Sequence, residues 1–152
     1  MAVKQISVLL GNIPGTLSRL TNILDKEDIT AKALLAASAA ESSMVRMVVN
    51  DPERARMVVN DPERAAAILE SFGFNYEVTP VLAAEVPLHP GGINAILNPL
   101  TKAEINIHYL YTTINRIGEE TIVILGVDKI DEAREVLQRN WIHLIEDEIY
   151  SL

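Results

Sequence analysis

The chain has 152 residues, and its 21 Asp and Glu outnumber 13 Lys and Arg, which gives a formal net charge of −8. Hydrophobic residues make up 49%, enough for a folded core. The acidic balance, without any Lys/Arg cluster, excludes a nucleic-acid partner, which needs cations against phosphate. The absence of cysteine excludes disulfides and thiolate chemistry. No signal-peptide core or membrane-spanning stretch is present in the sequence, so we expect a cytoplasmic protein without membrane partners.

The first half begins with a strand and a helix. Residues 5–10 alternate in polarity, which predicts a β-strand with Ile6, Val8 and Leu10 on its buried face. The Pro-Gly pair at 14–15 ends this strand. Four apolar side chains then recur at helical spacing and predict a helix ending near residue 26: Leu17, Leu20, Ile23 and Leu24.

Two strands, a helix and a final strand complete this half. Residues 29–39 and 43–49 predict the second and third strands. Asp61-Pro62-Glu63 is typical of a helix start, because Asp caps the helix and Pro fits its first turn, and this helix is expected to end at Gly73. With a strand at 76–78, the predicted order is β-α-β-β-α-β.

Ten residues are repeated without change inside this half, since Arg46–Ala55 recurs as Arg56–Ala65. We interpret the repeat as a local insertion, because deleting either copy brings the spacing between the two halves close to 76 residues. Either copy, Met47–Val49 or Met57–Val59, can supply the third strand. An inserted loop adds little to the free-energy cost of folding.

The second half repeats the order of the first. Strands are predicted at 81–86, 104–111, 121–127 and 142–150, and helices at 92–102 and 130–138. Residues 11–17 recur in outline as residues 87–93, which lie 76 positions later. The sequence therefore predicts an α+β fold of two domains, 1–79 and 80–152, separated only by Thr79-Pro80. We expect two ferredoxin-like βαββαβ domains side by side, each with an antiparallel sheet and helices on one face.

Residues 6–20, followed by Ile29-Thr30, resemble the opening of an ACT domain, a small regulatory module that typically binds an amino acid. The second half resembles the same family through Pro90-Gly91 and residues 104–109. The resemblance implies an allosteric sensor built of two ACT domains, with an amino acid held between the halves. The first residues also resemble the regulatory small subunit of acetohydroxyacid synthase, which implies valine-type feedback on a catalytic partner. A ligand-free interaction module is the third alternative.

In this family the ligand lies between the first turn of one domain and the second strand of its neighbour. The resemblance implies these ligand-binding residues: Gly11, Asn12, Ile13, Gly15, Thr16 and Leu17 on the turn, and Ile105, Asn106 and Ile107 on the strand. The Asn12 amide offers a donor and an acceptor, and Gly15 allows close backbone approach to a carboxylate. Because Leu88 replaces Asn12 and Thr30 replaces Asn106, we expect one good site and one degenerate site per chain.

The same residues also have ordinary structural explanations. A Pro-Gly turn before a helix is common, and Asn106 and His108, which strand parity places on the side away from the helices, also suit a plain sheet surface. No metal-binding spacing, phosphate loop or nucleophile elbow occurs in the sequence. We therefore expect no catalytic residue, metal or cofactor.

Parity also predicts an apolar surface for self-association on the sheet face away from the helices, formed by Leu9, Leu34 and Ala36. A homodimer and an amino-acid biosynthetic enzyme are therefore the expected macromolecular partners.

Overall fold

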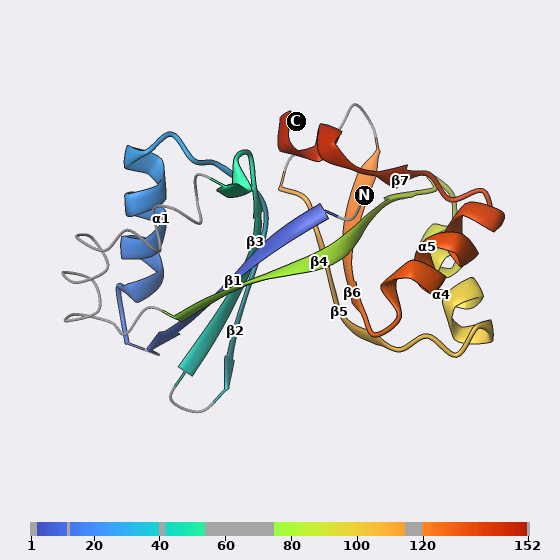
Figure 1. Ribbon diagram of the computed structural model, residues 1–152, viewed down its shortest axis with the longest axis horizontal. Coiled ribbons are helices and arrows are strands. Elements are labelled where there is room, and N and C mark those ends of the chain that lie inside the picture. The colour runs from blue at the N-terminus through green and yellow to red at the C-terminus, as the bar shows by residue number, and fades with distance from the viewer. Residues whose placement is uncertain (1–2, 12, 40–41, 54–74, 115–119, 152) are drawn as a thin grey trace. The chain divides into compact units, whose positions relative to one another are not determined.

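The computed structural model describes residues 3–11, 13–39, 42–53, 75–114 and 120–151 (Figure 1). The chain divides into two compact units. One is Lys4–Thr79, and the other is Pro80–Leu152 together with Met1–Val3.

The unit Lys4–Thr79 is an antiparallel sheet with a helix on one face. Its elements are β1 (Val3–Gly11), α1 (Thr16–Lys26), β2 (Ala31–Ala39), β3 (Ser42–Val49) and the start of β4 (Asn75–Val86). The strands lie in the order β2-β3-β1-β4. Ile6 pairs with Met47, and both are buried against Leu20 and Leu24 of α1. The predicted first strand and first helix are thus observed, and their apolar spacing forms this core.

The third strand is formed by the first copy of the ten-residue repeat. β3 ends at Val49, and Pro52 and Glu53 directly after it are helical. Glu53 is held to β1 by a 2.6 Å ion pair with the Lys4 ammonium. Met57–Val59 and the predicted helix at residues 61–73 lie outside the described residues.

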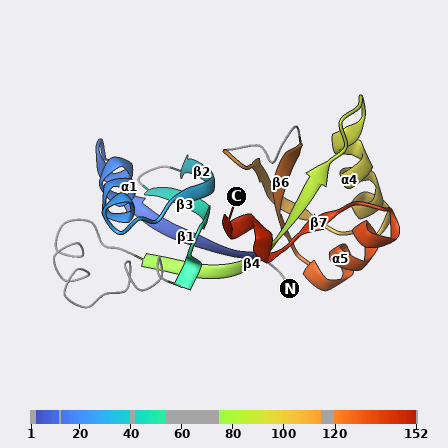
Figure 2. The same cartoon turned by 90° about the horizontal axis from the view of Figure 1, so that it is seen from above.

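The second unit contains all six elements of the predicted order. They are the rest of β4, α4 (Gly92–Lys102), β5 (Ile107–Thr112), β6 (Thr121–Val127), α5 (Ile130–Arg139) and β7 (Leu144–Ile145). β6 lies between β4 and β5, and β7 pairs with β4. Both helices lie on the same side of this sheet (Figures 1 and 2). Their buried side chains meet those of the strands in one core: Ile96, Leu100, Ala133 and Leu137 against Leu82, Ala84, Val123 and Leu125. The α+β class and the ferredoxin-like repeats are therefore confirmed.

Two predicted strand boundaries are wrong. β4 runs without interruption from Asn75 to Val86, because the fixed φ of Pro80 is compatible with extended backbone. The strand predicted at 142–150 is reduced to the two residues of β7, and a 3₁₀ helix follows at Asp147–Ser151. Ile145 and Ile149 are both buried. Their four-residue spacing suits a helical turn, whereas a strand would need an even alternation along its whole length.

A bulge in β2 corrects the predicted self-association surface. The pairing register shifts between Ala31 and Ala33, so that Leu34 lies opposite Met47. Leu34 consequently packs against the helix-side core, and Ala36 lies on the same face because alternate residues share a side. The prediction that Leu34 and Ala36 face away from the helices is wrong, whereas Leu9 does lie on the opposite face from Val8.

A second bulge shifts β5 in the same way. The register changes between Ile107 and Tyr109, and Leu110 then pairs with Leu125 of the helix-side core. Leu110 therefore lies on the helix-facing side and Tyr109 on the other, the reverse of what uninterrupted alternation from Ile107 would give.

Candidate functional site

The turn between β1 and α1 is built on a left-handed glycine. Gly15 has φ 92° and precedes the first helical residue, and its carbonyl accepts the Arg19 N–H at 3.0 Å. The Thr16 hydroxyl lies 3.0 Å from the carbonyl oxygens of both Gly11 and Ile13. The hydroxyl proton is therefore used inside the turn, and Thr16 acts first as a brace for the loop.

The same turn presents apolar side chains beside an uncapped helix start. No side chain caps α1. The Thr16 N–H donates to the Ile13 carbonyl at 3.3 Å, and the N–H groups of Leu17 and Ser18 are left without a side-chain acceptor. Ile13 is 68% exposed and Leu17 is 36% exposed. Donors for a carboxylate thus lie next to a small apolar surface. Asn12, the turn residue with the predicted amide contact, lies outside the described residues.

The corresponding turn of the second half has the same backbone. Gly91 has φ 85° and its carbonyl accepts the Ala95 N–H at 3.0 Å. No side chain caps α4, and the turn exposes Leu88 at 63% and Ile93 at 38%. The two turns differ in side chains, since Gly92 stands where the first half has Thr16, and Leu88 where it has Asn12.

The predicted residues of the second strand divide into core and surface. Ile105 is buried and Ile107 is half-buried, and both pack into the core of their unit, so only their backbone is available to a ligand. Asn106 is exposed and directly precedes β5. Its N–H donates to Asp128 Oδ1 at 3.0 Å, and its carbonyl accepts the Asp128 N–H at 3.2 Å. The Asn106 backbone is therefore fixed while its side chain faces outward.

The first half fixes the backbone of Thr30 by the same pair of hydrogen bonds. The Thr30 N–H donates to Asn50 Oδ1 at 2.9 Å, and its carbonyl accepts the Asn50 N–H at 3.0 Å. Asn50 therefore occupies the place that Asp128 holds in the second half. Sequence reasoning missed both braces, although the matched pair of segments Val49-Asn50 and Val127-Asp128 is visible in the sequence.

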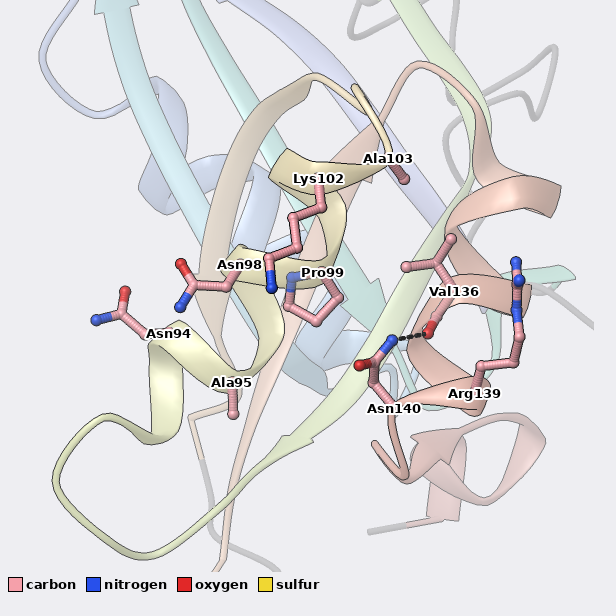
Figure 3. Close-up of a pocket in the computed structure, with 9 residues that line it drawn as sticks. All are labelled: Asn94, Ala95, Asn98, Pro99, Lys102, Ala103, Val136, Arg139 and Asn140. Atoms are coloured by element: carbon pink, nitrogen blue, oxygen red, sulfur yellow. Dashed lines mark hydrogen bonds between the residues drawn. The ribbon is translucent and has the colours of Figure 1, made fainter.

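A groove of about 610 Å³ lies between α4 and α5 (Figure 3). Pro99 and Val136 lie toward its centre, whereas Asn94 and Asn98 point away on one side and Arg139 lies on the far side of α5. The Asn140 amide is engaged with the Val136 carbonyl at 2.8 Å. Because the polar groups diverge, the groove does not assemble a polar recognition site.

Among the described residues, no group of three His, Asp or Glu side chains lies close enough to hold a metal ion. Within the same ranges no helix combines the length and apolar character that crossing a membrane requires.

Within the described residues, the two units repeat the same turn before a helix and the same brace at the second strand. The chain matches the family model of the ACT domain pair over residues 1–151, and it belongs to this family. It is thus built of domains that are regulatory, not catalytic. No curated protein matches the sequence.

Solved structures share this fold. Protein BT0572 from Bacteroides thetaiotaomicron has 28% identity and a TM-score of 0.85, over 100% of this chain and 98% of that chain. The ligand-free regulatory subunit of aspartate kinase from Thermus thermophilus has 13% identity and a TM-score of 0.64, over 91% of this chain and 92% of that chain. The corresponding subunit from Thermus flavus has 13% identity and a TM-score of 0.60, over 93% and 94%.

Proposed function

We propose that this protein senses an amino acid, which is bound by the Gly11–Leu17 turn together with Asn106 of the other half. The ligand's presence is then passed to a partner enzyme as a change in the equilibrium between conformations, because a ligand favours whichever state it binds better. Membership of the ACT domain pair family supports the regulatory role. The naming of two structures of similar fold as regulatory subunits of aspartate kinase supports an enzyme partner.

The observation that carries this proposal is the uncapped start of α1 beside exposed apolar side chains. An amino acid has a carboxylate that suits helix-start N–H groups. Its side chain, if aliphatic, would cover part of Ile13 and Leu17, which are exposed by 68% and 36% and would gain free energy on burial. The turn therefore favours an aliphatic over a charged amino acid.

The two sites of a chain are expected to differ. The first-half turn offers Asn12 and the second-half strand offers Asn106, whereas the opposite combination offers Leu88 and Thr30. Only the first combination can hydrogen-bond both the ammonium and the carboxylate of a ligand through carboxamides. We therefore propose one functional site per chain and one degenerate site.

A thermal-shift screen against the twenty amino acids tests the function. Ligand binding to the folded state raises Tm as its concentration exceeds Kd, so one or a few aliphatic amino acids should raise Tm, and Asn12→Ala should abolish the shift. Asn22→Ala, an exposed asparagine on α1, serves as the matched control and should keep it. A flat screen, or a full shift in Asn12→Ala, would contradict the proposal and favour the ligand-free interaction module.

A further inference from the structure

The single tryptophan of the chain is almost fully solvent-exposed. Trp141 is the second residue after α5, which ends at Arg139, and 94% of its surface is accessible. A tryptophan side chain is large and mainly apolar, and burying it against other residues is what normally makes it stabilise a fold. At this exposure Trp141 contributes almost nothing to the core of its unit.

The backbone conformation of Trp141 makes a tryptophan at this position more unusual. Trp141 has φ 62°, in the left-handed region that favours glycine at the end of a helix. The helix is closed by the Ile142 N–H on the Leu137 carbonyl at 3.0 Å and the Trp141 N–H on the Gln138 carbonyl at 3.2 Å. These bonds involve backbone groups only, so a glycine would make them equally well.

The chain itself uses other residues at equivalent positions. After α1 and α4 the left-handed residues are Asp28 and Glu104, each with φ 57°. In sequence, the residue of the first half that corresponds to Trp141 is Gly73, 68 positions earlier. Neither packing nor backbone geometry therefore accounts for a tryptophan here, which indicates a contact outside the chain.

The surroundings of Trp141 define the chemistry of that contact. A shallow pocket of about 490 Å³ is lined by Trp141, two apolar residues and four polar or acidic ones: Ile142 and Leu144, and Gln138, His143, Glu146 and Glu148. Glu146 already has an interaction partner, whereas the exposed Glu148 carboxylate makes no ion pair within the described residues.

We propose that Trp141 and Glu148 form a docking surface for a lysine or arginine side chain of a basic segment in a partner protein. A cation can stack on the indole face while its charge is matched by the carboxylate. Neither Trp141 nor Glu148 is among the residues proposed to bind the amino acid, so this surface serves partner recognition whether or not a ligand is bound. A second copy of the chain fits poorly, because a symmetric contact would place Glu146 and Glu148 against themselves in a molecule of net charge −8.

Fluorescence gives a direct test, because Trp141 is the only tryptophan. The peptide acetyl-Lys-Lys-Lys-Lys-amide is titrated into the full-length protein at low ionic strength, and the Trp141 emission should change saturably. Anisotropy of the same peptide carrying fluorescein then compares variants. Trp141→Gly and Glu148→Gln should each weaken binding by about threefold or more, as expected for a solvent-exposed cation–π contact and its charge partner. Glu120→Gln, which removes the same charge outside the pocket, should leave affinity unchanged.

A stability measurement distinguishes a docking role of Trp141 from a structural one. Trp141→Gly relieves the left-handed strain, so its Tm should equal or exceed that of the unmodified protein while peptide binding falls. Equal weakening by Glu120→Gln and Glu148→Gln would overturn the proposal in favour of non-specific charge attraction. Unchanged Trp141 emission at peptide saturation would also overturn it. So would a Trp141 emission maximum that shifts with protein concentration in the absence of peptide, which would place Trp141 itself in a contact between copies of the chain.

Discussion

At the residue scale, two glycines stand where any side chain would collide with a neighbour. A Cβ at Gly92 would lie 2.1 Å from the Pro87 carbonyl oxygen, and one at Gly126 would lie 2.2 Å from Tyr109 Cζ. The obstacle differs, because Pro87 presents backbone next to a helix start, whereas the Tyr109 ring can rotate aside.

We predict that Gly92→Ala lowers the free energy of unfolding by about 3 kcal/mol and Gly126→Ala by about 1 kcal/mol, the range of overpacking costs. Urea unfolding measures both. Gly11→Ala is the control, because its Cβ would meet Ile13 Cδ1 at an ordinary 3.8 Å. A cost for Gly126→Ala that equals or exceeds that of Gly92→Ala would show that the strand, not the turn, is the rigid element.

Local sequence pattern predicts some of the observed surface features and misses others. The Pro-Gly turns and the exposure of Asn106 follow from local pattern. Trp141 was missed, although its signal is present: Leu137 and Ile142 have the same spacing as Leu24 and Ile29, which close α1. This spacing marks the residue before the isoleucine as left-handed, and a tryptophan there conflicts with that requirement.

At the element scale, a side-chain brace fixes the entry to the second strand of each half. Asn50 Oδ1 accepts the Thr30 N–H, and its Nδ2 donates to the Asp28 carbonyl at 3.2 Å. Asn50→Ala removes both bonds, and we predict a loss of about 1–2 kcal/mol in unfolding free energy. The identical residue of the second copy provides the control, so Asn60→Ala should be near neutral. If chemical denaturation shows that Asn60→Ala lowers the unfolding free energy as much as Asn50→Ala or more, the assignment of the brace to Asn50 is contradicted.

The corresponding brace in the second half allows a conservative test. Asp128 Oδ1 accepts the Asn106 N–H. In the first half, Asn50 Oδ1 accepts the Thr30 N–H in the same way. Asp128→Asn should therefore retain stability within about 0.5 kcal/mol, whereas Asp128→Ala should lose about 1 kcal/mol. Urea midpoints compare the two, and equal losses would mean that charge, not the hydrogen bond, is what the position requires.

The two bulges explain why the sequence predicted the strands β2 and β5 but not the face of the sheet on which their residues lie. Periodicity locates β2 and β5, but the face of Leu34 or Leu110 depends on how many residues oppose one residue of the neighbouring strand. That count is a property of the pairing and is not encoded in the strand's own alternation. The same limit applies to the C-terminal segment, where tertiary packing of Ile149 selects a 3₁₀ helix over a strand.

At the scale of the whole molecule, the ten-residue repeat is expected to be dispensable. β3 already ends in the first copy, at Val49. Deleting residues 56–65 leaves the same sequence as deleting the first copy, and a ten-residue change in the length of a connection alters its closure entropy by well under about 1 kcal/mol. We predict a Tm within about 4 °C of the full chain. A calorimetric Tm lower by much more would mean that the second copy is a structural element.

Self-association is the second prediction at this scale. With Leu34 turned inward, the sheet face opposite α1 carries Leu9 with its cross-strand neighbour Met44, and Leu35 with Arg46. We predict a homodimer at micromolar concentration, and Leu9→Glu should shift it toward monomer because it places a charge on this face. Sedimentation velocity distinguishes the species, and a monomer for the unmodified chain would contradict the prediction.

The order of the described elements was predictable because each half repeats the other, so an ambiguous segment has a clearer counterpart. The identity of the ligand could not be predicted from the sequence, because selectivity depends on side chains that meet only when the domains pair. The central claim is therefore best tested by isothermal titration calorimetry with the amino acid that gives the largest thermal shift. We predict saturable binding of one ligand per chain, lost in Asn12→Ala. Two equivalent sites per chain would contradict the distinction between a functional and a degenerate site, and the absence of any binding heat across temperatures would contradict the sensor itself.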